Sequence, residues 1–222
     1  MSLTKTGRAG GALSNTRFYG ILDIAYVPVE RWTNVCVALI EGGASLIQIR
    51  AKHASPSERK ELVRKVLHLF DPVSGKPPFL VINDDVELCA RLPGTGLHIG
   101  QEDTPPAEAR RRIGSDRLLG LSTHSQRQAQ AALDLPEGVL NYFCTGPVFA
   151  TPTKPDYAPV GLDLVRWVAG RHPDLTWYCI GGINRENMSE VIRAGAKRVV
   201  VVSDVLLDAD PASAVRAITA QL

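Results

Sequence analysis

A proline-rich loop between Gly146 and Gly161, GPVFATPTKPDYAPVG, follows the apolar run YFCTG. It carries two threonines, Thr151 and Thr153, and a single lysine, Lys154, among four prolines. The prolines stiffen this segment, and hydroxyl and ammonium donors together suit an anion. The loop is therefore expected to hold phosphate.

Three donor side chains alternate at Gln48, Arg50 and Lys52, after the apolar residues of SLIQIR. Alternate residues of a strand point to one face. A bidentate guanidinium and a compact ammonium on that face suit a multiply charged phosphate. The alternative is an ion pair with a neighbouring strand end.

Two carboxylates, Asp84 and Asp103, follow consecutive apolar runs. Mg²⁺ binds one or two carboxylates together with phosphate oxygens, so the pair predicts a magnesium site. The alternative is helix N-capping, notably for Asp103, which directly precedes Thr104 and two prolines.

A second, uncharged anion site is indicated by Gly181-Gly182 in CIGGIN and by Ser203 after RVVVV. Exposed backbone N–H groups at such places bind anions. A tight turn is the alternative for the glycines. Two unlike anion sites imply two phosphorylated ligands, or one ligand with phosphate at both ends.

The elements that position these residues follow a regular alternation. Short apolar runs suit strands buried on both faces of a parallel sheet, and the segments between them have helical patterns. The apolar runs are 17–23, 45–50, 79–84, 96–100, 118–123, 142–146, 177–182 and 198–203; the helical segments are 29–43, 55–70, 104–114, 125–133, 161–171, 184–196 and 210–222, with a short turn at 86–92. Eight such units predict a single-domain (β/α)8 barrel, whose chemistry lies at the carboxyl ends of the strands. A doubly wound open sheet is the alternative.

Composition narrows the class of protein. A net charge of +2 argues against a nucleic-acid surface, and no apolar run approaches the roughly 18 residues of a membrane span. Four cysteines without a Cys-x-x-Cys pair are expected to be buried, reduced thiols in a cytoplasmic protein. Residues 1–16 are expected to be a disordered tail without a secretory signal, and 17–222 to be the barrel. The oligomeric state is not indicated.

Seven motifs from about Phe18 to Pro211 resemble, in order and spacing, those of the thiamine-phosphate synthase family. They are IQIRAK, VINDD, LHIGQED, GLSTHS, TGPVFATPTK, CIGGIN and VVVVSD. The resemblance implies a Mg²⁺-assisted transfer. A hydroxymethylpyrimidine diphosphate is joined to a thiazole phosphate, which gives thiamine phosphate and pyrophosphate.

The resemblance also implies a role for each matching residue. The pyrimidine diphosphate would contact Gln48, Arg50, Lys52, Asn83, Ser122 and Lys154. Among these, Arg50, Lys52, Ser122 and Lys154 would act in catalysis. The thiazole phosphate would contact Thr151, Thr153, Gly182, Val202 and Ser203. Asp84 and Asp103 would bind the metal.

Two departures from the family pattern are evident. Ala51 stands where the family usually has an acidic residue, and Asp85, expected to point outward, stands where an arginine is frequent. His98 is either a core histidine or a substrate contact, and His124 either begins a helix or acts in catalysis. Rival functions are a metal-free thiazole tautomerase and a non-catalytic binding protein.

Overall fold

The computed structural model describes residues 13, 15–70, 78–153 and 157–222. Within them, eight parallel strands close into a barrel in sequence order, with β1 paired to β8. This confirms the (β/α)8 prediction and excludes the open sheet. The strands are β1 (Phe18–Asp23), β2 (Leu46–Arg50), β3 (Phe79–Asn83), β4 (Thr95–Ile99), β5 (Leu119–Thr123), β6 (Tyr142–Thr145), β7 (Thr176–Ile180) and β8 (Val199–Val200).

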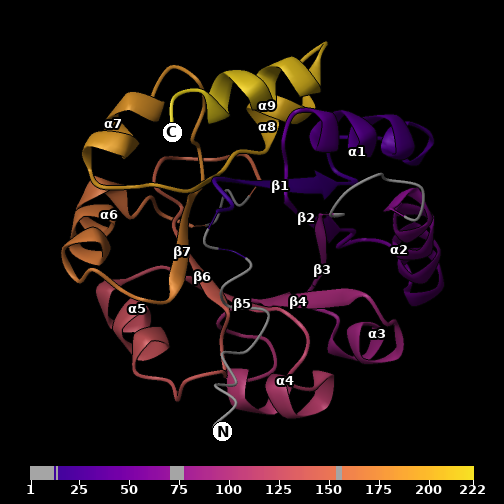
Figure 1. Cartoon of the computed structure of the whole chain (residues 1–222), viewed down its shortest axis with the longest axis horizontal. Helices are drawn as coiled ribbons and strands as arrows, with labels where there is room; N and C mark the ends of the chain where they lie inside the picture. The colour runs from indigo at the N-terminus through magenta and orange to yellow at the C-terminus, as the bar shows by residue number, and fades with distance from the viewer. Residues whose placement is uncertain (1–12, 14, 71–77, 154–156) are drawn as a thin grey trace, which may run out of the picture.

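Helices surround the strands (Figure 1). They are η2 (Val29–Arg31), α1 (Trp32–Glu41), α2 (Pro56–Phe70), α3 (Val86–Arg91), α4 (Pro106–Ile113), α5 (Gln126–Leu133), α6 (Gly161–Gly170), α7 (Met188–Arg193), α8 (Ser203–Leu206) and α9 (Pro211–Thr219). Local sequence explains several helix starts. Before α2, the Ser55 hydroxyl accepts from Glu58 N while Glu58 accepts from Ser55 N, which is a capping box. The side chains of Asp85, Ser125 and Asp210 cap α3, α5 and α9.

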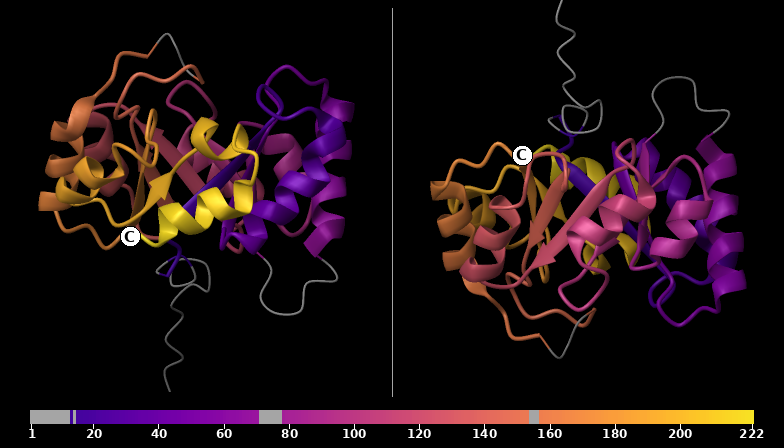
Figure 2. Two further views of the ribbon diagram at one scale, coloured as in Figure 1. Left: turned by 90° about the horizontal axis from the view of Figure 1, so that it is seen from above. Right: turned by 90° about the horizontal axis from the view of Figure 1, so that it is seen from below.

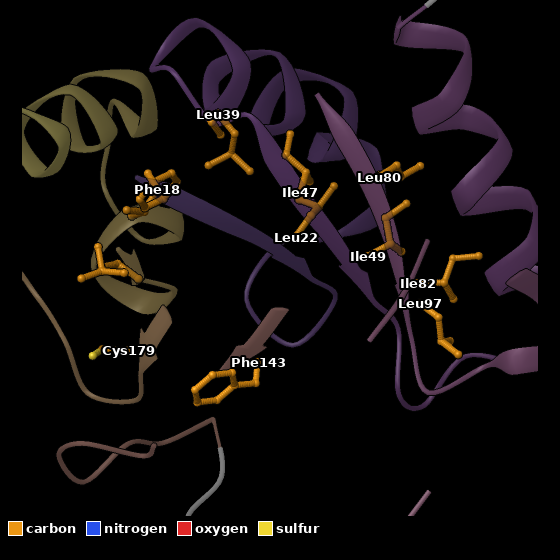
Figure 3. Close-up of a cluster of buried hydrophobic side chains, with 14 of the residues drawn as sticks. Phe18, Leu22, Leu39, Ile47, Ile49, Leu80, Ile82, Leu97, Phe143 and Cys179 are labelled. Carbon is orange, nitrogen blue, oxygen red and sulfur yellow. The ribbon is translucent and has the colours of Figure 1, made fainter. Parts of the chain in front are cut away.

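Strand side chains alternate between two cores. The outer core lies between strands and helices, where Phe18 and Leu22 of β1 and Leu39 of α1 are buried (Figure 3). The inner core fills the barrel and includes Tyr19, Tyr142 and Tyr178. The period of two along each strand therefore separates helix packing from the interior that lies beneath the site.

The chain upstream of β1 enters this inner core. Of the range 1–16 expected to be a disordered tail, residues 1–12 and 14 lie outside the described part. Leu13 and Thr16 are buried, and the Thr16 hydroxyl hydrogen-bonds Tyr178 Oη inside the barrel. The packed chain thus includes residues before position 17.

The structure differs from the sequence prediction at β8, which ends at Val200 and not at Ser203. The chain turns at Val202, whose helical backbone angles begin α8, so Ser203 is the first residue of a short helix. All four cysteines are buried and lie outside disulfide bonds, as expected. No helix in the described part of the chain is long and apolar enough to cross a membrane.

Candidate active site

One pocket at the carboxyl ends of the strands collects most of the candidate residues. Its lining includes Gly146, Pro147 and Thr151 of the loop after β6. This loop lies at the end of the barrel opposite the C-terminus (Figure 2). The volume of the pocket is about 80 Å³. The candidates that line it are Gln48, Arg50, Asn83, Ser122, Thr151, Thr153, Gly182, Val202 and Ser203.

Arg50 is held in place by an acid that the sequence analysis did not use. Its Nη1 lies 2.5 Å from Oδ2 of Asp23, the last residue of β1, and Asp23 is only 1% exposed. Asp23 Oδ1 also accepts from Ala25 N. The ion-pair alternative therefore holds for Arg50. The guanidinium carries five N–H donors, however, and Arg50 still lines the pocket.

The pocket floor is a network of buried hydroxyls and one imidazole. Gln48 Nε2 donates to Tyr19 Oη at 2.6 Å, and Tyr19 Oη lies 3.0 Å from Tyr142 Oη. His98 connects Tyr142 to Ser122 through its two ring nitrogens. His98 is 6% exposed and hydrogen-bonded, as expected of a core histidine, and it also lines the pocket, where substrate contact stays a prediction. Burial holds the pKa values of Tyr19 and Tyr142 well above their usual range, so both remain hydroxyl donors.

The neutral wall requires glycine for steric reasons. Gly181 and Gly182 have φ values of +98° and +64°. A Cβ at Gly181 would lie 2.4 Å from Pro147, and one at Gly182 would lie 2.5 Å from the carbonyl oxygen of Ala150. The β6 loop thus packs against this turn, which brings Thr151 and Gly182 into one wall.

Two aromatic residues contact the β6 loop from neighbouring segments. The Tyr26 hydroxyl lies 2.7 Å from the Thr153 hydroxyl. The His124 ring lies 4.8 Å from that of Tyr157, and His124 Nδ1 is 2.5 Å from Gly146 O. His124 precedes Ser125, the N-cap of α5, so it sits at a helix start and also contacts the loop. Lys154 lies outside the described residues.

Lys52 lies in a different place from that expected, whereas Asp84 directly follows β3 as expected. Strand β2 ends at Arg50, and Lys52 follows in a turn, so it is not on the strand face of Gln48. Both residues line an adjoining cavity of about 250 Å³ beside α2. Asn83 lines both cavities and therefore connects them.

Asp85 does not point outward, contrary to expectation. Its side chain caps α3 by accepting from Leu88 N and lies 3.2 Å from Nε of Arg59 on α2. The extra negative charge beside the candidate metal site is therefore paired. The other departure, Ala51, is buried against the same cavity.

Other residues occupy the helix caps next to the two candidate metal ligands. Asp85, not Asp84, caps α3, and Pro105 precedes α4 without a side-chain cap. Asp103 Oδ2 instead accepts from Gly100 N at 2.7 Å. Among the described residues, no three His, Cys, Asp or Glu side chains group as a metal site. Carboxylates at the ends of adjacent strands β3 and β4 nevertheless fit Mg²⁺, which needs few protein ligands when phosphate is bound.

Sequence reasoning missed Asp23, Tyr26, Tyr19 and Tyr142 as parts of the site. Asp23 was recognisable as a polar strand end. The two strand tyrosines lie within apolar runs and are indistinguishable there from ordinary core residues.

A closed barrel with a donor-lined pocket at the carboxyl ends of its strands is the arrangement of (β/α)8-barrel enzymes. Residues 18–205 match the family model described as thiamine monophosphate synthase. The chain belongs to this family, which confirms the resemblance seen in the motifs.

Curated relatives carry the same name. The chain is 40% identical over 185 residues to a thiamine-phosphate synthase of Acidothermus cellulolyticus, covering 83% of this chain and 85% of the relative. It is 38% identical to one of Chloroflexus aurantiacus, covering 92% and 91%. Among solved structures, a thiamine phosphate pyrophosphorylase from Pyrococcus furiosus aligns with a TM-score of 0.74 and 28% identity, covering 92% of this chain and 96% of that one.

Proposed function

We propose that the protein is a thiamine-phosphate synthase. It would join 4-amino-2-methyl-5-hydroxymethylpyrimidine diphosphate to a thiazole phosphate and release pyrophosphate. The family membership supports the reaction class. The single observation that carries the substrate assignment is one pocket with two unlike walls, one with Arg50 and amides and the other with glycine and hydroxyls.

The first wall suits the pyrimidine diphosphate. Arg50 offers N–H donors beyond the one that contacts Asp23. Asn83 lines both this pocket and the adjoining cavity, which Lys52 also lines. A guanidinium and an ammonium on one side stabilise a group that gains negative charge. Gln48 and Ser122 lie nearby with amide and hydroxyl groups that suit the polar edge of a pyrimidine.

The second wall suits the thiazole phosphate. Hydroxyl donors come from Thr151, Thr153 and Ser203. At Gly182 and Val202 the phosphate would approach the backbone closely. Neutral donors bind a phosphate that stays unchanged through the reaction, and this wall does not compete for the leaving diphosphate.

The reaction needs no nucleophilic side chain. The bond between the pyrimidine methylene carbon and the diphosphate oxygen breaks, and both electrons leave with pyrophosphate. The thiazole nitrogen then donates its lone pair to the methylene carbon, which forms the new C–N bond. Arg50, Lys52 and Lys154 stabilise the departing charge. Mg²⁺, held by Asp84 and Asp103, would neutralise part of the same charge.

The test is pyrophosphate release from purified protein, measured with each substrate alone, with both, and with and without Mg²⁺. The proposal expects release only when both substrates and Mg²⁺ are present. Isomerisation of a thiazole phosphate without pyrophosphate would favour the tautomerase alternative. Binding without any turnover would favour the non-catalytic alternative. On this proposal the two substrates are metabolites of the cytoplasm, and four buried cysteines outside disulfide bonds fit that reducing compartment.

A further inference from the structure

A continuous hydrogen-bond chain crosses the barrel interior and joins two points of the pocket. It runs from Gln48 Nε2 to Tyr19 Oη over 2.6 Å and on to Tyr142 Oη over 3.0 Å. From there it reaches His98 Nδ1 over 3.1 Å, and His98 Nε2 lies 3.0 Å from Ser122 Oγ. Gln48 and Ser122, its two ends, line the pocket, whereas Tyr142 is fully buried.

The chemistry of the links gives this chain a direction. Each tyrosine hydroxyl has one proton to donate, and a neutral imidazole carries a proton on one nitrogen only. When the Gln48 amide nitrogen donates to Tyr19, Tyr19 donates to Tyr142 and Tyr142 donates to His98 Nδ1. The proton of His98 is then on Nε2 and is donated to Ser122. The Ser122 proton is left to point into the pocket.

The opposite direction satisfies the same contacts. The two ends of an amide have the same shape, so a rotated Gln48 amide accepts from Tyr19 through its oxygen. Every later donor then reverses, and the His98 proton moves to Nδ1. Ser122 donates to His98 and offers the pocket only lone pairs, whereas Gln48 now offers its N–H groups.

We infer that Tyr19, Tyr142 and His98 couple the hydrogen-bonding polarity of Gln48 to that of Ser122. The pocket therefore offers one donor and one acceptor at these two points in either state. A ligand seated between them must carry both kinds of group. On the proposed function, an aminopyrimidine ring does so, with its amino group and its ring nitrogens. Tyr19 and Tyr142 are thus positioning residues.

Tyr178 provides a matched control for the two coupling tyrosines. It is equally buried and makes edge contacts with Tyr19 and Tyr142 at 5.4 and 5.7 Å between ring centroids. Its hydroxyl hydrogen-bonds Thr16 and so lies outside the chain. Removing it leaves a similar defect in the same core without breaking the coupling.

The direct test moves the proton of His98 by a change three links away. Gln48→Glu places a carboxylate, which only accepts when ionised, at the start of the chain. In the free protein, ¹⁵N NMR of His98 should show its proton on Nδ1 once ¹³C NMR shows the new carboxyl ionised. Adding Tyr178→Phe should preserve this effect, and adding Tyr142→Phe should abolish it. A His98 proton on Nε2 while the carboxyl is ionised, or the same displacement to Nδ1 in the Tyr142→Phe double variant, would overturn the inference.

A kinetic comparison of Tyr142→Phe with Tyr178→Phe tests the coupling independently. It does not depend on whether the carboxyl introduced by Gln48→Glu ionises. Tyr142→Phe should lower kcat/KM for the pyrimidine diphosphate by roughly tenfold or more, since a buried partner is lost. Tyr178→Phe should stay within about twofold, and neither should change KM for the thiazole phosphate. Equal effects of the two variants on kcat/KM for the pyrimidine diphosphate would contradict the coupling. The NMR arm needs no turnover, so failure of the proposed function and failure of this inference remain distinguishable.

Discussion

At the scale of single residues, Asp84 is unusual in its backbone. Its φ is +62°, and among the described non-glycine residues only His172, at +48°, also has a positive φ. Such a conformation costs about 1–3 kcal/mol and is found preferentially at functional sites. The next residue, Asp85, is anchored by its ion pair with Arg59 and by its cap on α3, and these contacts hold the turn in place.

Asp84→Asn is expected to remove Mg²⁺-dependent turnover without unfolding the protein. Asparagine tolerates the same backbone region, so the change removes charge and leaves the turn intact. A loss of about 10²–10³ in kcat is expected, as for other preorganised groups that stabilise developing charge. Asp103→Asn should behave in the same way. Rates over a Mg²⁺ titration, with a thermal melt as control, measure this. Near-normal rates at every Mg²⁺ concentration would refute the metal role of that residue.

Lys154→Ala should reduce kcat by about 10²–10³, because its ammonium is expected to meet pyrophosphate as charge builds on it. Binding of the thiazole phosphate should persist, since Thr151 and Ser203 remain. Lys60→Ala, on the exposed face of α2, is the control, because it removes the same charge elsewhere, and it should leave kcat unchanged. A Lys154 variant within a few-fold of normal would reduce this lysine to a solvated loop charge.

At the scale of elements, the turn after β7 fixes the neutral wall. Gly182→Ala should destabilise the protein by about 1–3 kcal/mol, since φ is +64° and the new Cβ meets Ala150 O. It should also raise KM for the thiazole phosphate by displacing the β6 loop. Gly170→Ala, at the end of α6 with open space around it, should be neutral or stabilising. Denaturant unfolding and two-substrate kinetics measure both effects. Equal stability of the two variants would contradict the strain argument.

Sequence periodicity predicted the order of the elements because each strand is a short apolar run and each longer helix has an amphipathic repeat. It failed at β8 and α8, since four helical residues are too few to show a repeat. Strand ends indicated most of the pocket. Alternation placed Lys52 with Gln48 and Arg50, but the strand stops at Arg50 and the turn carries Lys52 to the next cavity.

At the scale of the whole molecule, burial of protonated groups sets the alkaline limit of stability. Burial raises the pKa of Cys36 from 9.0 to about 12 and raises that of Cys179 further in the same direction. Above about pH 9 the unfolded chain loses these protons and the folded chain keeps them. Stability therefore falls as pH rises, by up to about 1.4 kcal/mol per pH unit for each group.

Denaturant unfolding between pH 7 and 10.5 should show a plateau up to about pH 8 and then a decline. Cys36→Ala should lessen the slope of that decline, although it lowers stability at every pH by creating a cavity. A stability that rises above pH 9, or a slope unchanged by Cys36→Ala, would show that Cys36 is not protected in the folded state.

On the proposed function, the two walls of one pocket hold different substrates. Two-substrate initial-rate kinetics on Ser203→Ala and Asn83→Ala measure this separation. A hydroxyl on an unchanging phosphate contributes equally in ground and transition states, so Ser203→Ala should raise KM for the thiazole phosphate with little change in kcat. Asn83→Ala should weaken binding of the pyrimidine diphosphate and leave KM for the thiazole phosphate unchanged. If both variants affect the same substrate, the assignment of the two walls is contradicted.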